Sequence, residues 1–259
     1  KIFIKIIDDR GIEKVGDLNM KKSIVILGGC GGIGRALVEQ LNELNFEPIV
    51  FDLERSIKKH SVDCVCIPVD ATELQSIKDA SNEIHSEIYG FVNLVGFMSD
   101  NVSLIDTKTE TWNEVISGNL ESVFLSAKAL SGKIREGGSI VLTSSGLGHF
   151  ARPGYGPYAI AKAGVSAIAR QLALELSPQI RVNAVAPAAV DTAFLRGGTG
   201  RSSENEPPRF DHEKYAEAIP LRRIAVPKDI TGPIIFLLSE EASYITGQTI
   251  HVNGGSYMP

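Results

Sequence analysis

The feature that most constrains the fold is an apolar run that leads into a glycine-rich turn and then into a helical pattern. Residues 23–27 are mostly apolar and β-branched, as in a strand buried on both faces, and Gly28-Gly29-Cys30-Gly31-Gly32-Ile33-Gly34 follows them. A helical pattern then continues to Leu44. In this arrangement backbone N–H groups and the helix N-terminus can hold a pyrophosphate. The stretch predicts a dinucleotide site, with contacts from Gly28, Cys30, Gly32, Ile33 and Gly34.

A second apolar run, residues 48–51, ends in Asp52. A carboxylate at the end of the second strand can accept hydrogen bonds from the adenosine ribose and would repel a 2′-phosphate. Asp52 therefore predicts NAD as the cofactor, in preference to NADP. A helix cap or a solvated loop residue is the other interpretation of this side chain.

Tyr158 and Lys162 lie four residues apart in an apparent helix over residues 156–176, so they should share one face. A tyrosine has an ordinary pKa of about 10, and a positive charge a few ångströms away favours its phenolate. Such a tyrosine can exchange protons near neutral pH as a general acid/base. The same spacing also fits an amphipathic helix with a snorkelling lysine, so the pair gains meaning from other motifs.

Those other motifs are Asn93-Leu94-Val95-Gly96, Asn119, Ser145 and Pro187-Ala188-Ala189-Val190-Asp191-Thr192. With them, residues 21–257 resemble the short-chain dehydrogenase/reductase family in motif order and spacing. The resemblance implies that Tyr158 is the general acid/base and that Lys162 lowers its pKa and holds the nicotinamide ribose. It further implies that Ser145 binds the substrate oxygen and that Asn119 holds a water in a proton relay. By the same resemblance the cofactor site includes Asp70, Ala71, Asn93, Gly96, Tyr158, Lys162, Pro187, Val190 and Thr192.

The remaining pattern alternates between apolar runs and helical spacing. Runs at 64–69, 88–95, 139–143, 180–186 and 249–252 alternate with helical patterns at 72–86, 109–130 and 156–176. This alternation predicts an α/β fold: a single-domain, Rossmann-like, doubly wound parallel sheet of about seven strands with helices on both faces. The link between Asp52 and Cys64 is short for a crossover, so the helix there should be shrunken or missing.

Two segments lie outside this regular pattern. Met20-Lys21-Lys22 before an apolar run is typical of a chain start, so we expect residues 1–20 to be an N-terminal extension or added arm; an extra edge strand is the alternative. The domain itself should span residues 21–259. Within it, residues 191–220 are expected to form a substrate lid, although their polar composition also fits a loop without a gating role.

Composition excludes several classes of protein. The net charge is −5 with scattered basic residues, so we expect no nucleic-acid partner, and no apolar run approaches the ~18 residues needed to span a membrane. The three cysteines, Cys30, Cys64 and Cys66, lack the spacing of metal ligands. We therefore expect no metal, reduced thiols and a cytoplasmic location.

These observations predict an oxidoreductase that transfers a hydride between NAD(H) and a secondary alcohol or ketone. One alternative is an NADP(H)-dependent carbonyl reductase of the 3-oxoacyl type, and another is a non-catalytic dinucleotide-binding regulatory protein. Polyols, hydroxy acids, dihydrodiols and steroid-like alcohols all remain open as substrates, and His149, Phe150 and Tyr155 could contact them. The resemblance implies a homo-oligomer, tetramer or dimer, with interfaces on the helices at 109–130 and 156–176.

Overall fold

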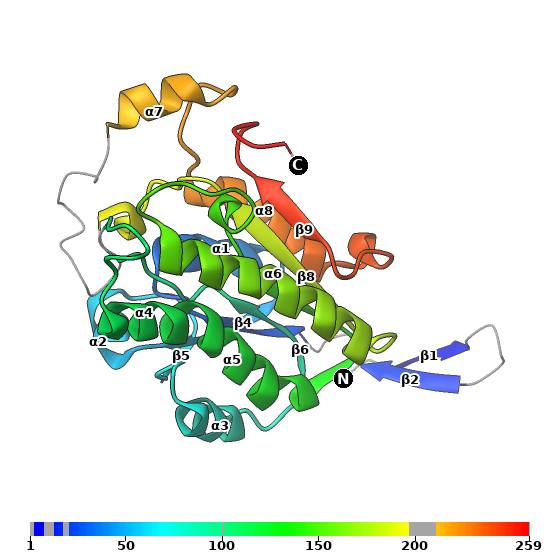
Figure 1. Cartoon of the computed structure of the whole chain (residues 1–259). Coiled ribbons are helices and arrows are strands. Elements are labelled where there is room, and N and C mark those ends of the chain that lie inside the picture. Colours follow the sequence, from blue (N-terminus) through cyan, green and yellow to red (C-terminus); the bar gives the residue numbers. More distant parts are fainter. Residues whose placement is uncertain (1–2, 8–12, 18–20, 100, 197–210, 259) are drawn as a thin grey trace.

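The structure, a computed structural model of the chain, describes residues 3–7, 13–17, 21–99, 101–196 and 211–258 (Figure 1). A seven-stranded sheet has the order β5-β4-β3-β6-β7-β8-β9, and every neighbouring pair is parallel. Its strands are β3 (Ser23–Leu27), β4 (Glu47–Asp52), β5 (Val65–Pro68), β6 (Ile88–Asn93), β7 (Ile134–Thr143), β8 (Ile180–Pro187) and β9 (Thr249–Val252). The predicted doubly wound fold is confirmed.

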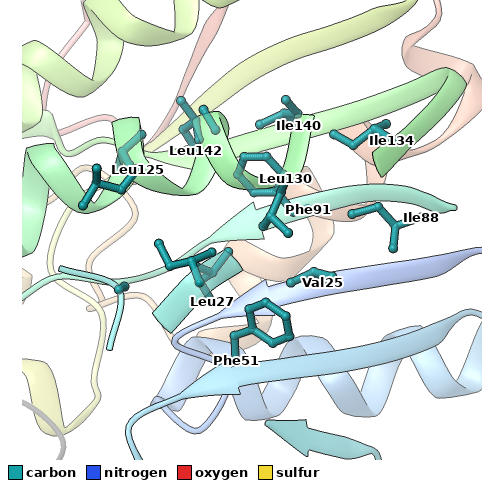
Figure 2. Packing of buried hydrophobic residues seen from close by; sticks show 14 of the residues in the cluster. Val25, Leu27, Phe51, Ile88, Phe91, Leu125, Leu130, Ile134, Ile140 and Leu142 are labelled. Atoms are coloured by element: carbon teal, nitrogen blue, oxygen red, sulfur yellow. The ribbon is translucent and has the colours of Figure 1, made fainter. Parts of the chain in front are cut away.

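Helices cover both faces of this sheet (Figure 1). One face packs against α1 (Gly32–Glu43) and α8 (Pro227–Leu238), and the other against α3 (Leu74–Glu83), α5 (Ser122–Leu130) and α6 (Gly156–Leu176). Helix α4 (Thr109–Ile116) packs on α6. Successive side chains along a strand point to opposite faces of the sheet, so each strand contributes to both cores. In β3, Ile24 and Ile26 face α1 and α8, while Val25 and Leu27 join the core on the other face (Figure 2).

The strand order places a crevice at the carboxyl edge of the sheet. The chain runs outward from β3 to β4 and β5, and then returns to β6 on the other side of β3. Loops leaving β3 and β6 therefore diverge, which opens the position where doubly wound sheets bind their ligands. Gly28 follows β3 and Leu94 follows β6, so the glycine turn lies at this switch point.

Some elements differ from those expected. The short crossover contains a single helix of six residues, α2 (Glu54–Lys59), as the length of the link predicts. In contrast, sequence analysis assigns no element to the stretch that forms α8, because Pro227, Gly232 and Pro233 obscure its helical pattern. Pro227 is tolerated in the first turn, where N–H groups have no intrahelical partner. Strand β7 begins at Ile134 rather than Ser139, with an irregular register opposite β6.

The N-terminal strands β1 (Phe3–Ile7) and β2 (Glu13–Asp17) form a separate antiparallel sheet, so they are not edge strands of the main sheet. In the expected lid, a short 3₁₀ turn spans Ala193–Arg196 and α7 spans His212–Ala218. The lid residues 197–210 lie outside the described residues. Among the described residues, no helix combines the length and apolar character that crossing a membrane requires.

Candidate active site

A cavity of about 990 Å³ opens along the carboxyl edge of the sheet. Residues at or just after the carboxyl ends of all seven strands of the sheet contribute to its wall: Gly28, Asp52, Val69, Leu94, Ser144, Pro187 and Asn253. Volumes of this size are typical of sites for drug-sized ligands and cofactors. The cavity joins the glycine turn to the N-terminal part of α6.

The glycine turn is shaped so that side chains would fill it. Gly28 has a φ of +79°, and a Cβ there would lie 3.1 Å from the carbonyl carbon of Leu94. A Cβ on Gly34 would lie 2.5 Å from the main-chain oxygen of Gly29. Only glycine therefore permits this close backbone approach. The first turn of α1 follows immediately with its N–H groups directed outward, so the turn fits the pyrophosphate of a dinucleotide.

Asp52 braces this turn from the end of β4. One carboxylate oxygen accepts a hydrogen bond from Cys30 N at 2.9 Å, and the other accepts one from Leu53 N at 2.8 Å. Each oxygen keeps a second lone pair for a ligand, and Asp52 also lines the cavity. Asp52 thus caps the local backbone while remaining available to a ribose.

Tyr158 and Lys162 are buried on the same face of α6, as their spacing predicts. Tyr158 is 7% exposed and Lys162 is 2% exposed, and Lys162 Nζ lies 5.7 Å from the centroid of the Tyr158 ring. Lys162 Nζ also donates a hydrogen bond to the main-chain oxygen of Thr143 at 2.8 Å. Both side chains and Ser145 line the cavity, so the structure brings the three together.

Burial dominates the electrostatics of this pair. It raises the pKa of Tyr158 to about 12, against a hydrogen bond from Ser145 that lowers it. It also lowers the pKa of Lys162 to about 8. The predicted lowering of the Tyr158 pKa by Lys162 is not met, because loss of hydration disfavours both charged forms when both groups are buried.

Asn119 lies where the long helix is interrupted. Five residues between α4 and α5, Ser117–Glu121, form a π-helical segment, and Asn119 within it is fully buried. Its Oδ1 accepts from Phe97 N at 3.1 Å, and its Nδ2 donates to the main-chain oxygens of Phe97 at 3.0 Å and Val115 at 2.9 Å. Both amide protons are therefore used, and one lone pair of Oδ1 remains.

Gly96 lets Asn119 and Lys162 approach the same piece of backbone. A Cβ on Gly96 would lie 2.6 Å from Asn119 Oδ1 and 3.2 Å from Lys162 Nζ. A larger residue would force the two side chains away from this position. Gly96 therefore allows the remaining acceptor of Asn119 and the lysine ammonium to share one neighbourhood.

Most residues expected at the site line the cavity, but three lie behind its wall. The lining includes Gly28, Gly32, Ile33, Gly34, Asp52, Asp70, Ala71, Gly96, Ser145, Tyr158, Lys162, Pro187, Val190 and Thr192. Cys30, Asn93 and Asn119 are buried behind it. Asn93 donates to Ser126 Oγ at 3.1 Å and accepts from Val95 N at 3.0 Å, so it shapes the turn after β6. Burial raises the pKa of the Cys30 thiol to about 12, as in an unreactive core cysteine.

The cavity also has walls that the sequence motifs do not mark. Phe97, Met98, Arg152, Phe194 and Tyr215 contribute to it. Phe194 and Tyr215 belong to the segment predicted as the substrate lid, residues 191–220. Phe97 and Met98 directly follow the fourth-strand motif, which is the signal that could identify them. His149 does not line the cavity, contrary to the substrate contact considered for it. Among the described residues, no group of three or more His, Cys, Asp or Glu side chains could hold a metal ion.

A family model and curated relatives both match this chain over nearly its whole length. A family model described as enoyl-(acyl carrier protein) reductase matches residues 29–257. The chain is 31% identical over 251 residues to a 3-oxoacyl-(acyl-carrier-protein) reductase of Buchnera aphidicola subsp. Baizongia pistaciae, covering 92% of this chain and 98% of that protein. A protein of the same description from Staphylococcus aureus strain Mu50 is 34% identical over 256 residues, and the match covers 93% of this chain and 100% of that protein.

Solved structures share the whole fold. The ligand-free aldohexose dehydrogenase of Thermoplasma acidophilum has a TM-score of 0.82 at 25% identity, covering 92% of this chain and 96% of that one. A short-chain dehydrogenase/reductase of Brucella melitensis, described as a glucose/ribitol dehydrogenase, has a TM-score of 0.82 at 27% identity, covering 93% of this chain and 100% of that one.

Proposed function

Because this chain belongs to the short-chain dehydrogenase/reductase family, we propose that it transfers a hydride between NAD(H) and a secondary alcohol or ketone. One observation carries the proposal: Ser145, Tyr158 and Lys162 meet on the wall of the cavity that also contains the glycine turn. A dinucleotide held at that turn would extend along the same wall toward Tyr158. When bound, the nicotinamide accepts or supplies the hydride.

The residues of the chain manage position and protons. Tyr158 exchanges a proton with the substrate oxygen, and Ser145 donates or accepts the second hydrogen bond to that oxygen. Lys162 has three ammonium protons, of which one is given to Thr143, so two remain for the ribose hydroxyls and for a water. The free lone pair of Asn119 Oδ1 would hold that water beside Lys162.

Asp52 supports the choice of NAD over NADP. Its carboxylate lies on the cavity wall with a free lone pair on each oxygen, so it can accept from a ribose hydroxyl. A 2′-phosphate at the same place would meet a like charge. Arg55 lines the same end of the cavity, and it is the residue that would serve the alternative, an NADP(H)-dependent carbonyl reductase. Binding constants for NAD⁺ and NADP⁺ decide between the two.

The substrate end of the cavity favours an apolar body with an anionic group. Phe97, Phe150, Phe194 and Tyr215 line it, and the Phe194 ring lies 5.9 Å from the ring of Tyr158. Such walls suit a ring or an acyl chain better than a polyol. Arg152 also lines this cavity, and among the described residues no carboxylate pairs with it. Its guanidinium can bind a substrate carboxylate.

A screen of secondary alcohols with NAD⁺, followed by the absorbance of NADH, tests the reaction. The set should contain aryl and alkyl hydroxy acids, their methyl esters, and polyols. We expect turnover of the apolar hydroxy acids. Tyr158→Phe should lower kcat by about 10²–10⁴-fold, the usual contribution of general acid/base catalysis, while NAD⁺ still binds. Turnover retained by this variant would remove Tyr158 from the reaction.

The role of Arg152 is tested separately. Arg152→Met should raise KM for a hydroxy acid and leave KM for its methyl ester unchanged, because only the acid presents a carboxylate. Arg152→Lys should recover part of the loss, since it keeps the charge. An equal loss for acid and ester would show that Arg152 acts on the shape of the cavity.

Other features concern the domain and its assembly. We propose that residues 21–259 are one catalytic domain and that 191–220 form its lid, since Tyr215 and Ala218 of α7 line the cavity.

Three exposed apolar residues, Phe124 on α5 and Ile160 and Leu174 on α6, support a homo-oligomer, tetramer or dimer, that assembles through these helices. Light scattering after gel filtration measures this. Three free cysteines support a cytoplasmic location.

A further inference from the structure

A chain of hydrogen bonds lies behind the active-site wall, between the end of β7 and α6. Ser144 Oγ donates to the main-chain oxygen of Lys162 at 2.8 Å and lies 2.8 Å from Ser166 Oγ. Ser166 Oγ lies 3.2 Å from Nε2 of His149. Both serines are buried. This buried serine chain, His149–Ser166–Ser144, ties the segment that carries Ser145 to the turn of α6 that carries Lys162.

Counting protons gives the buried serine chain a direction. A carbonyl oxygen only accepts, so the hydroxyl proton of Ser144 is committed to Lys162. Ser166 must therefore donate to Ser144, which uses its own proton. His149 Nε2 is then the donor to Ser166. Burial is the largest of the effects that hold the pKa of His149 below its ordinary value, so near neutral pH the uncharged ring carries its single proton on Nε2.

Two close contacts surround His149: the loop after Ser145 packs on α6, and the His251 ring packs on the His149 ring. A Cβ on Gly148 would lie 2.8 Å from the carbonyl carbon of Lys162, so the loop after Ser145 rests directly on the helix backbone. From the outer side, the ring of His251 on β9 meets the His149 ring edge-on, with centroids 4.5 Å apart. His149 thus lies between β9 and α6, where it can hold the loop without touching substrate.

We propose that His149 is a positioning residue for the proposed reaction. Its Nε2–H anchors the two buried serines, and these hold the loop of Ser145 against the turn of α6 that carries Lys162. Without the donor, Ser166 would have a free acceptor in a buried site, and the loop would shift to satisfy it. The hydrogen bond between Ser145 and Tyr158 would then lengthen. His149 therefore acts on the reaction through Ser145.

The test replaces the donor while keeping the volume of the side chain. His149→Met removes the N–H, and His149→Gln places an amide N–H close to the Nε2 position. We expect the Met variant to lower kcat for alcohol oxidation about 10-fold or more, because misplacement by 1 Å can cost about 100-fold. NAD⁺ affinity should stay unchanged. The Gln variant should recover most of the lost kcat.

A pH profile separates positioning from simple destabilisation. The hydrogen bond from Ser145 lowers the pKa of Tyr158, so a looser bond should move the rising limb of kcat against pH to higher pH. His251→Met is the matched control, because it removes the neighbouring ring and leaves the buried serine chain intact. Its kcat and the pH of its rising limb should equal those of the wild type. Should His149→Met fail to fold, Ser166→Ala interrupts the same chain and should shift the limb in the same direction.

Two results would overturn the proposal. One is a wild-type kcat and pH limb in folded His149→Met or in Ser166→Ala. The other is a Gln variant no more active than the Met variant. Either leaves the proposed function standing, since the wild-type enzyme still turns over its alcohol. A wild-type protein that oxidises no alcohol would instead refute both, because the positioning role rests on the proposed function.

Discussion

Lys162 should destabilise the protein at neutral pH, and the size of the effect follows from its burial. Its pKa falls from 10.5 to about 8 on folding because the ammonium loses hydration. Each pKa unit is worth about 1.4 kcal/mol, so the fall in the pKa of Lys162 corresponds to about 3 kcal/mol. At neutral pH the lysine is still charged in the folded protein, so folding must bury an ammonium that has lost most of its hydration.

The sign of the pH dependence follows from proton counts. Between pH 8 and 10.5 the unfolded chain still binds the lysine proton, while the folded protein has released it. The free energy of unfolding therefore rises with pH across this window. Most of this rise, about 2–3 kcal/mol, should occur between pH 7 and pH 10, below the range in which the raised pKa of Tyr158 has the opposite effect.

Lys162→Met isolates this effect. Urea unfolding of both proteins at several pH values gives the difference in unfolding free energy, and the loss of the hydrogen bond to Thr143 adds the same amount at every pH. From pH 7 to pH 10, the unfolding free energy of the wild type should rise by about 2–3 kcal/mol more than that of the variant. Lys128→Met, on the exposed side of α5, is the control and should show a constant difference. A constant difference for Lys162→Met as well would refute the reasoning.

Three further predictions concern the cofactor and the frame of the site. Asp52→Asn should lower the preference for NAD⁺ over NADP⁺ by about 100-fold in the ratio of binding constants, since like charges about 5 Å apart repel by about 3 kcal/mol at an effective dielectric constant of about 20; an unchanged ratio contradicts the role of Asp52. Asn119→Leu removes the amide that accepts from the N–H of Phe97 and donates to its carbonyl, so unfolding free energy should fall by about 2–6 kcal/mol in urea titrations. A loss of activity without that fall would instead favour a purely catalytic role. Gly34→Ala brings a Cβ to 2.5 Å from Gly29 O, so calorimetry should show NAD⁺ affinity reduced at least tenfold, whereas unaltered affinity would mean that the turn can relax.

Features that depend on neighbours in the chain followed from the sequence. The alternation of strands and helices predicted the doubly wound sheet, because the periods of two and 3.6 are properties of the backbone. Tyr158 and Lys162 share a face for the same reason, and the short link after Asp52 predicted the small size of α2. Helix α8 shows no clear period in the sequence because two prolines and a glycine hide it, and packing on α1 and the sheet helps to stabilise the helix.

Features that depend on segments far apart in the chain needed the tertiary structure. Spacing predicted that Lys162 would lower the pKa of Tyr158, but loops and helices from distant parts of the chain bury both groups, and loss of hydration reverses the expected direction. The same assembly turns His149 away from the cavity toward Ser166, and it lines the substrate end with Phe194, Tyr215 and Arg152. Local spacing fixes which side chains lie next to each other on one element. Burial and electrostatics sum over every element that surrounds a group, so they are decided only when the chain has folded.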